Sequence, residues 1–213
     1  MIEFIDKELK QGNLRKKLFP MMVNFGVHDY SETVHSLGLN YLTAIGREFR
    51  ETTSLSEYPV YPFSFPENNS DNVKVAEDVS SYGKKGQKKD EVRPDSVWFS
   101  KEDNSALLLC EFERLNSTRS KKRKLKEKIQ NLLIAYHQLG GKVPVILFVF
   151  WSYPQQSPGD ISDIISILDN GFHKADGSYI AGINGLSTSY LIYHCIAKQI
   201  NDRIILNEWI KIR

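Results

Sequence analysis

The chain has 213 residues, which is enough for one α/β domain with a sizeable core and too few to require two. Its content of 41% apolar and 25% charged residues is ordinary for a soluble globular protein, and no apolar run is long enough to span a bilayer. The net charge of +2 indicates no particular partner, so only the distribution of the charges is informative.

The N-terminus and the cysteines bear on the cellular compartment. The first residues, MIEFIDKELKQG, place acids among apolar residues and lack both the basic segment and the apolar core of a signal peptide. We therefore expect a cytoplasmic protein. Cys110 and Cys195 each lie in an apolar, strand-like run, so we expect buried free thiols and no disulfide or metal pair.

Two helical segments are predicted at the start of the chain. Residues 1–20 indicate a short helix with a basic tail that ends near Pro20. Residues 29–50 carry apolar side chains at the spacing of an amphipathic helix. Asp29 is suited to cap this helix, and Glu32, three residues later, would complete a capping box.

An irregular connection and three strands follow. Residues 56–72 are rich in proline, aromatic residues and asparagine, which is typical of an extended connection. Apolar patterning then predicts a meander of three strands at 73–83, 92–100 and 105–115. Because the apolar run of the third strand is continuous, we expect this strand to be buried on both faces near the centre of the sheet.

The next helix and strand carry the α/β signal. Apolar residues at helical spacing predict a helix over 120–139. The almost wholly apolar residues 143–152 predict a buried strand, which a crossover would place parallel to the strand before the helix. Lys124 and Lys128 lie along one flank of the helix's apolar stripe, and Lys126 lies along another.

The C-terminal part of the chain is less regular. Residues 160–172 suit a short helix, residues 189–200 a strand, and residues 203–213 a final strand or short helix. The histidines are scattered, without metal-ligand spacing, and neither a phosphate-binding Gly-rich loop nor a nucleophile elbow is present in the sequence.

Three acids interrupt the apolar strands. Asp95 follows Pro94 at the head of the second strand of the meander, and Glu111 and Glu113 end the third. Since side chains alternate along a strand, Glu111 and Glu113 share one face. The two strands are neighbours, so the three carboxylates can converge.

Converging carboxylates point to a hard cation. Buried carboxylates repel one another and are costly to desolvate, so such a cluster persists if it is exposed, protonated, paired with Arg or Lys, or bound to a cation. Mg²⁺ takes a few carboxylate oxygens and completes its shell with waters and substrate phosphate. This arrangement favours the hydrolysis of phosphodiesters.

Basic clusters flank the acids on both sides. A polyanion drawn to these clusters would be brought onto the carboxylates, whereas taken alone each cluster is more typical of a solvated helix face or loop. The candidate nucleic-acid-binding residues are Lys84, Lys85, Lys88 and Lys89 before the acids and Arg119, Lys121, Lys122, Arg123 and Lys124 after them.

A purely structural alternative stays open at this point. Glu111 and Glu113 would then mark a strand end that emerges into solvent and would pair with Arg114 or Lys101. Asp95 would be an ordinary turn residue.

The acids and their surroundings resemble the PD-(D/E)xK nuclease superfamily. Pro94-Asp95, fifteen intervening residues and Glu111-Phe112-Glu113 at the end of an apolar strand are followed by a Lys- and Gln-bearing helix and another apolar strand. The resemblance implies a restriction-endonuclease-like α/β core with a central mixed sheet flanked by helices. We therefore expect one domain over residues 1–213, with this core at about 29–152 and a C-terminal extension at 153–213.

The same resemblance implies roles for individual residues. Asp95 and Glu111 would hold Mg²⁺, or Mn²⁺ in its place, with the backbone carbonyl of Phe112 as a further ligand. Glu48, or with less support Glu32, would approach from the first long helix, although Glu48 could also be a solvated flank residue.

One position departs from the pattern. The third motif residue is usually lysine, and here it is Glu113. A minority of restriction enzymes in the superfamily carry this Glu-x-Glu variant, and their second glutamate looks like a metal ligand or general base. The missing positive charge would then come from Lys126 or Lys128 of the following helix, or from Arg114.

The sequence therefore predicts a Mg²⁺-dependent nuclease, on DNA or alternatively RNA, with a role in restriction, defence or mobile elements. The resemblance also allows a homodimer that cuts two strands. A catalytically inactive module that binds nucleic acid or a protein partner is the alternative, in which Glu113 marks lost catalysis. A structural domain without a nucleic-acid role is a third interpretation.

Overall fold

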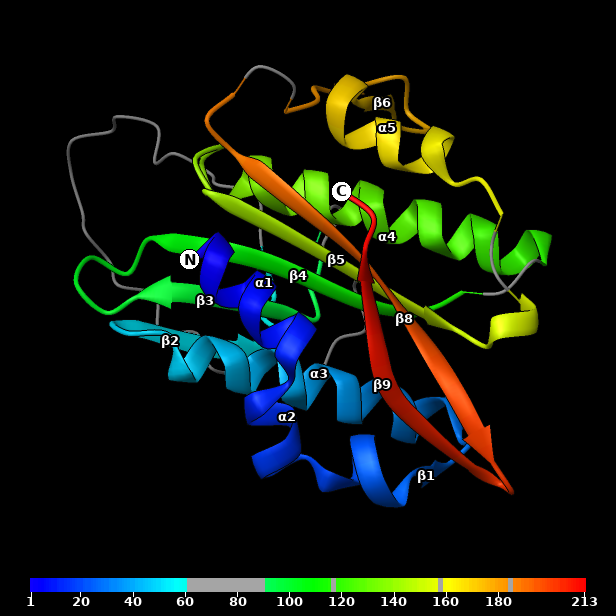
Figure 1. Cartoon of the computed structure of the whole chain (residues 1–213). Coiled ribbons are helices and arrows are strands. Elements are labelled where there is room, and N and C mark those ends of the chain that lie inside the picture. Colours follow the sequence, from blue (N-terminus) through cyan, green and yellow to red (C-terminus); the bar gives the residue numbers. More distant parts are fainter. Residues whose placement is uncertain (61–90, 116–117, 157–158, 184–185) are drawn as a thin grey trace, which may run out of the picture.

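The computed structural model describes residues 1–60, 91–115, 118–156, 159–183 and 186–213. A curled, mixed sheet of seven strands forms its centre, in the order β1-β9-β8-β5-β4-β3-β2 (Figure 1). The strands of this sheet are β1 (Val27–His28), β2 (Thr52–Ser56), β3 (Ser96–Ser100), β4 (Ala106–Arg114), β5 (Val145–Ser152), β8 (Ser189–Ile200) and β9 (Arg203–Lys211). A separate small ribbon pairs β6 (Phe172–His173) with β7 (Tyr179–Ile180).

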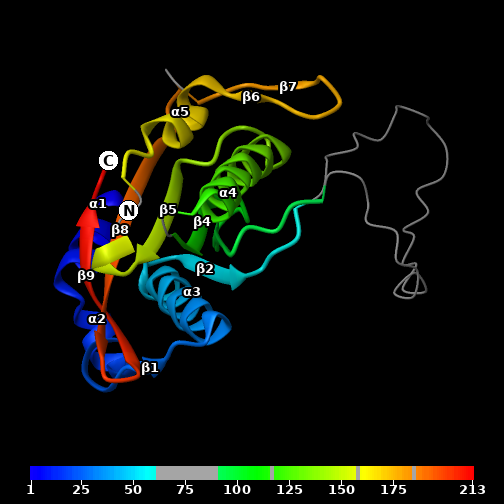
Figure 2. The same ribbon diagram turned by 90° about the vertical axis from the view of Figure 1, so that its right-hand side faces the viewer.

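Helices cover both faces of the sheet (Figure 2). On one face lie α1 (Ile2–Gln11), α2 (Asn13–Leu18) and α3 (Ser31–Glu48), and on the other lie α4 (Arg119–Gln138) and α5 (Ser162–Asn170). The described residues also include a π-helix at Met21–Phe25 and a 3₁₀ turn at Pro154–Gln156. No helix in these described ranges combines the length and apolarity needed to cross a membrane.

Strand β4 shows how alternation builds the two cores. Cys110 and Phe112 point into the core that contains α1 and α3, whereas Leu109 points into the core under α4 and α5. Strand β4 pairs antiparallel with β3 and parallel with β5, as predicted for the strands on either side of a crossover helix. Cys110 and Cys195 are buried free thiols, which confirms that prediction.

The predicted helices over 29–50, 120–139 and 160–172 are confirmed as α3, α4 and α5, with shifts of a few residues at their ends. The first predicted helix is divided in two by Gly12, which adopts a left-handed conformation at φ +64°. A side chain at this position would collide with the guanidinium of Arg15. The break therefore serves the packing of that arginine.

Arg15 is a buried cation that joins the two ends of the fold. Its guanidinium lies 5.6 Å from the ring centroid of Tyr41 and 5.2 Å from that of Trp209. It donates a hydrogen bond of 3.2 Å to the carbonyl of Asn207. The buried carboxylate of Glu8 accepts hydrogen bonds from the backbone of Arg15 and from the hydroxyl of Tyr41, so an early helix and the last strand share one cluster.

The capping box predicted for the long helix is wrong in its first member. Tyr30 is the N-cap of α3 and makes no side-chain capping bond. Asp29 instead lies 3.2 Å from the guanidinium of Arg114 and accepts a hydrogen bond from the hydroxyl of Tyr153. The side chain of Glu32 lies outside the described part of the structure.

The predicted meander needs one correction. Its first strand, 73–83, lies outside the described residues, and the strand that pairs with β3 away from β4 is β2. Strand β2 was not predicted because its inward side chains, Thr52 and Ser54, are buried but polar. Ser54 hydrogen-bonds the hydroxyl of Ser96 at 3.3 Å, so hydroxyl pairs replace the apolar alternation that identifies a strand.

The C-terminal segment belongs to the same sheet as the predicted core. Strand β8 lies parallel to β5, and β9 lies antiparallel to β8, which settles residues 203–211 as a strand. The described architecture is thus a mixed α/β sheet flanked by helices.

Candidate functional site

Asp95 and Glu111 lie side by side where β3 begins and β4 ends. Ser96 pairs with Cys110, so Asp95, one residue earlier, comes next to Glu111. The backbone N–H of Phe112 donates a hydrogen bond of 2.7 Å to Oδ2 of Asp95, which fixes the carboxylate against β4. Asp95 is 4% exposed and Glu111 is fully buried.

Lys128 of α4 bridges the two acids. Its Nζ lies 3.1 Å from Oδ1 of Asp95 and 2.7 Å from Oε2 of Glu111. The apolar stripe of α4 packs on the sheet, so a side chain at the edge of that stripe reaches down to the end of β4. One ammonium therefore serves two buried carboxylates.

The second carboxylate oxygen of Glu111 has no partner. Oε1 is buried and makes no hydrogen bond within the part of the chain that the structure describes. A buried polar atom without a partner costs about 1–3 kcal/mol, and more if it is charged. With both acids ionised, the trio of Asp95, Glu111 and Lys128 carries one excess negative charge.

Burial and the neighbouring charges shift the pKa values of Glu111 and Lys128. Burial raises the pKa of Glu111 well above its ordinary value, and the neighbouring charge of Asp95 adds to the rise. Burial alone would lower the pKa of Lys128, but the charges of Glu111 and Asp95 outweigh it, so the pKa of Lys128 is raised. The lysine stays charged, and the site attracts a proton or another cation.

Glu113 is buried beside this trio but has its own partners. Its Oε2 lies 3.0 Å from Nζ of Lys124, and its Oε1 accepts a hydrogen bond of 3.0 Å from the backbone N–H of Arg114. Over the described ranges, no group of three or more His, Cys, Asp or Glu side chains is arranged to hold a metal ion. The sequence predicted that three carboxylates converge. In the structure Asp95 and Glu111 share one lysine, and Glu113 lies beside them in a separate ion pair with Lys124.

A pocket of about 530 Å³ is lined by Asp95, Glu113, Lys124 and Lys128, whereas the fully buried Glu111 is not part of its lining. Its wall includes Glu57, Trp151 and a set of basic side chains that would attract an anion. The basic members are Arg93, Arg114, Lys124 and Lys128, together with His35, whose Nε2 lies 3.8 Å from Oδ1 of Asp95.

Arg114 makes three side-chain contacts at this wall. Its guanidinium lies 4.9 Å from the ring centroid of Trp151 and 5.4 Å from that of Tyr153, and it pairs with Asp29. These contacts fix the direction in which its charge is presented to the pocket.

The structural alternative is wrong in placing the acids at a solvent-exposed strand end and in pairing them with Arg114 or Lys101. Asp95, Glu111 and Glu113 are all buried, and none emerges into solvent at a strand end. Their charged partners are lysines of α4, whereas Lys101 lies in the turn between β3 and β4.

Two residues predicted for the site lie elsewhere. Glu48 is at the last turn of α3 and lines a different pocket with Phe4 and Lys17. His35 of the same helix contacts the site, and thirteen residues of helix separate the two by about 20 Å. Lys126 lies on the opposite flank of α4 from Lys128, so of these two lysines only Lys128 contacts the acids.

The remaining predicted residues are placed as follows. Phe112 contributes its backbone N–H to Asp95. Lys84, Lys85, Lys88 and Lys89 lie outside the described residues. His35, Arg93 and Trp151 were missed, although Arg93 directly precedes Pro94-Asp95 and could have been noticed from its position.

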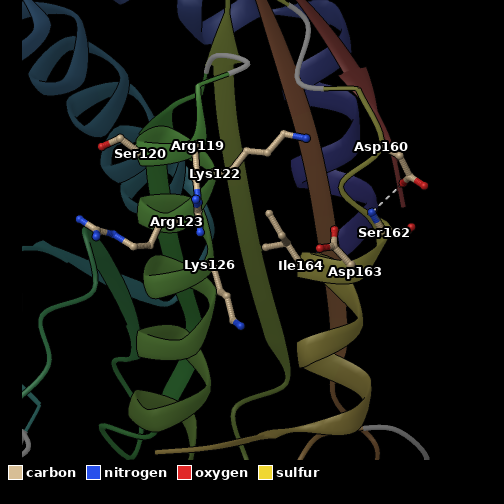
Figure 3. Close-up of a pocket in the computed structure, with 9 residues that line it drawn as sticks. All are labelled: Arg119, Ser120, Lys122, Arg123, Lys126, Asp160, Ser162, Asp163 and Ile164. Atoms are coloured by element: carbon tan, nitrogen blue, oxygen red, sulfur yellow. Dashed lines mark hydrogen bonds between the residues drawn. The ribbon is translucent and has the colours of Figure 1, made fainter. Parts of the chain in front are cut away.

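The opposite flank of α4 borders a second, larger cleft of about 980 Å³ (Figure 3). Its α4 wall carries Arg119, Ser120, Lys122, Arg123 and Lys126. Asp160, Ser162, Asp163 and Ile164, at the start of α5, form the other wall.

Comparisons of the chain with protein-family models, with curated proteins and with solved structures found no match.

Proposed function

We propose that the chain is a divalent-metal-dependent nuclease of the PD-(D/E)xK type. The observation that carries the proposal is Oε1 of Glu111, a buried carboxylate oxygen without a partner in the described residues, beside a second buried carboxylate. An atom of this kind is costly unless a ligand completes its surroundings.

The donor set fits Mg²⁺ or Mn²⁺. Both ions accept carboxylate oxygens, and Mg²⁺ commonly keeps several waters and binds through only one or two carboxylates plus substrate phosphate. Asp95 and Glu111 would hold the ion, and the excess negative charge of the trio favours a cation there. Such an ion supplies neutralisation of phosphate charge and a more acidic water.

The other pocket residues support phosphate chemistry. Lys128, held between the two acids, can donate to a phosphate oxygen or orient the attacking water. Arg114, Arg93 and Lys124 present positive charge to a phosphodiester in the pocket. Glu113, at the same wall, is suited to take a proton from the water or to bind a second ion.

Duplex DNA is the proposed substrate, with RNA as the alternative. The basic N-terminal half of α4 lies directly beside the carboxylates and would contact the phosphates of a nucleic acid.

The test is cleavage of plasmid and of linear single-stranded DNA with and without Mg²⁺. Glu111→Gln and Asp95→Asn should each lower the Mg²⁺-dependent rate by at least about 10³-fold, since each removes a charged ligand. Glu102→Gln, an exposed acid in the turn between β3 and β4, is the matched control and should cleave normally. Thermal unfolding checks that all three variants fold.

A second readout does not depend on turnover. Titration calorimetry with Mn²⁺ should detect binding to the wild type and to Glu102→Gln but weak or no binding to Glu111→Gln. Unchanged cleavage by both carboxylate variants would refute the mechanism.

A second candidate is a nuclease-like module that binds nucleic acid without cutting it. The position of Lys128 favours this candidate, because its ammonium already neutralises part of the acid pair without a metal. Salt-dependent DNA binding together with no cleavage in Mg²⁺ or Mn²⁺ would support it.

A further inference from the structure

Helix α4 presents positive charge on two flanks that its buried stripe separates. Lys124 and Lys128, four residues apart, turn toward the carboxylates of β3 and β4. Lys122 and Lys126, also four residues apart, extend toward α5 on the other side (Figure 3). Leu125 and Ile129 lie buried between the two rows, so neither row can reach the ligands of the other.

Most of the cations on the α5 side of α4 form no ion pair with the described residues. Within the described ranges, Arg119, Lys122 and Lys126 form no ion pair within 4.0 Å, whereas Arg123 pairs with Glu127 at 3.5 Å. Lys124 and Lys128 of the other row are both paired with buried acids. Positive charge that is left without a partner along one wall of an open cleft is suited to bind an anion.

The acids across the cleft offset only part of the positive charge of this wall. Asp160 accepts a hydrogen bond of 2.8 Å from the backbone N–H of Ser162, and this bond, with a smaller contribution from the charge of Lys122, lowers its pKa. Asp163 is exposed. Arg119, Lys122 and Lys126, the lining cations without an ion pair among the described residues, therefore exceed the two acids of the cleft by one positive charge, which leaves room and charge for a phosphate group.

The spacing of the two rows matches a duplex. A helix with its side chains is about 10–12 Å across, which is close to the major-groove width of about 12 Å that separates the two backbones of B-DNA. We propose that the α4–α5 cleft binds the phosphates of the second strand of a duplex whose first strand enters the carboxylate pocket. The proposal rests on the proposed function for its class of ligand.

The test compares duplex and single-stranded binding by fluorescence anisotropy in EDTA, with a labelled duplex of about 20 base pairs and one of its strands. The cleft variant is Lys122→Ala with Lys126→Ala. The matched control is Lys10→Ala with Lys16→Ala, which removes the same charge from exposed positions on α1 and α2. All proteins are titrated over a range of salt concentrations.

The cleft variant should bind the duplex about tenfold more weakly at 150 mM salt, and the slope of log K against log salt should become less steep by about 2. Its affinity for the single strand should fall by less than about threefold, as should both affinities of the control. Asp163→Asn, which removes an exposed acid from the cleft, should strengthen duplex binding by about two- to threefold. This variant changes affinity in the opposite direction, so a folding defect cannot imitate it.

Equal losses on duplex and single strand, or equal losses in the cleft variant and the control, would overturn the proposal. So would a duplex affinity that neither the cleft variant nor Asp163→Asn changes. Because no divalent metal is present, the result does not depend on cleavage. If the cleft variant and Asp163→Asn change duplex affinity as expected but the protein shows no Mg²⁺-dependent cleavage, only the proposed function is refuted.

Discussion

The two flanks of helix α4 handle charge in opposite ways. Toward β3 and β4, Lys124 and Lys128 are each paired with buried carboxylates, and the excess charge is negative. Toward α5, Lys122 and Lys126 have no ion-pair partner among the described residues, and the excess is positive. The difference shows that the apolar stripe of one basic helix can separate a flank whose lysines pair with buried acids from a flank whose lysines line an open cleft without an ion pair among the described residues.

The largest expected difference between the flanks is in stability. Lys128→Met leaves two buried carboxylates without a cation and should lower the free energy of unfolding by about 3–5 kcal/mol. Lys126→Met, two residues away on the exposed flank, should change it by no more than about 0.5 kcal/mol. Urea unfolding in EDTA measures both values, and equal losses would contradict the comparison.

The same pair of variants sharpens the metal proposal. Mg²⁺ should restore part of the stability of Lys128→Met, because an ion that binds the two acids replaces the lost ammonium. Mg²⁺ should have no such effect on the difference between Lys126→Met and the wild type.

A smaller change in the free energy of unfolding is expected for Glu111→Gln without divalent metal. The pKa of Glu111 is raised in the folded protein above its usual value near 4.5, so the folded state binds the proton more tightly than the unfolded state does. The contribution of Glu111 to stability is therefore fully present below pH 4.5 and is lost as pH rises. Since glutamine cannot ionise, the variant should be more stable than the wild type by about 1–3 kcal/mol at pH 7.

Chemical unfolding of both proteins at several pH values checks this prediction. The difference between them should shrink as the pH approaches 4.5 and below. A variant that is less stable than the wild type at pH 7 would show that the ionised carboxylate is not a cost to the fold.

The smallest effect concerns His194, on the sheet face that α4 and α5 cover. His194 is 8% exposed, stacks on Phe150 with ring centroids 4.6 Å apart, and hydrogen-bonds the neutral hydroxyl of Ser152 at 2.8 Å. Burial lowers its pKa, against a smaller opposing contribution from the charge of Glu208. Unlike the carboxylate pocket, this buried group has a neutral hydrogen-bond partner.

Because the pKa of His194 is lowered by folding, the protein should lose stability as the pH falls. The unfolded state takes up a proton near pH 6.5 and the folded state does so only at lower pH, so stability is present above 6.5 and is lost as the pH falls. From pH 7 to pH 5 the wild type should lose about 1 kcal/mol more than His194→Gln. Parallel stability curves for the two proteins would contradict this expectation.

The sequence was most informative where periodicity decides the geometry. The 3.6-residue repeat of the helix over 120–139 correctly separated Lys128 from Lys126, and the two-residue repeat of β4 correctly placed Glu111 and Glu113 on one face. Periodicity did not decide which lysine row faces the acids, because that depends on the side of β4 on which the helix packs.

The wrong predictions for Glu48 and Asp29 arose because tertiary contacts, and not the local sequence pattern, decide where these side chains lie. The pattern of α3 identifies its buried stripe but not which of its turns lies over the end of β4, so Glu48 was considered where His35 is found. Asp29 has the chemistry of a cap, but a contact with Arg114, 85 residues later, uses its carboxylate instead. Contacts between residues this far apart in sequence leave no local signal.

The contacts of Arg15 with distant residues affect how the chain folds during synthesis. Arg15 of the second helix contacts Tyr41 of α3, but its other partners, Asn207 and Trp209, come from β9. During synthesis the N-terminal segment must therefore wait, with its arginine and its apolar side chains incompletely covered, until β9 has emerged. The packing of the first two helices is tied to the synthesis of β9, and a nascent chain that stops short of this strand leaves a recognisable exposed surface.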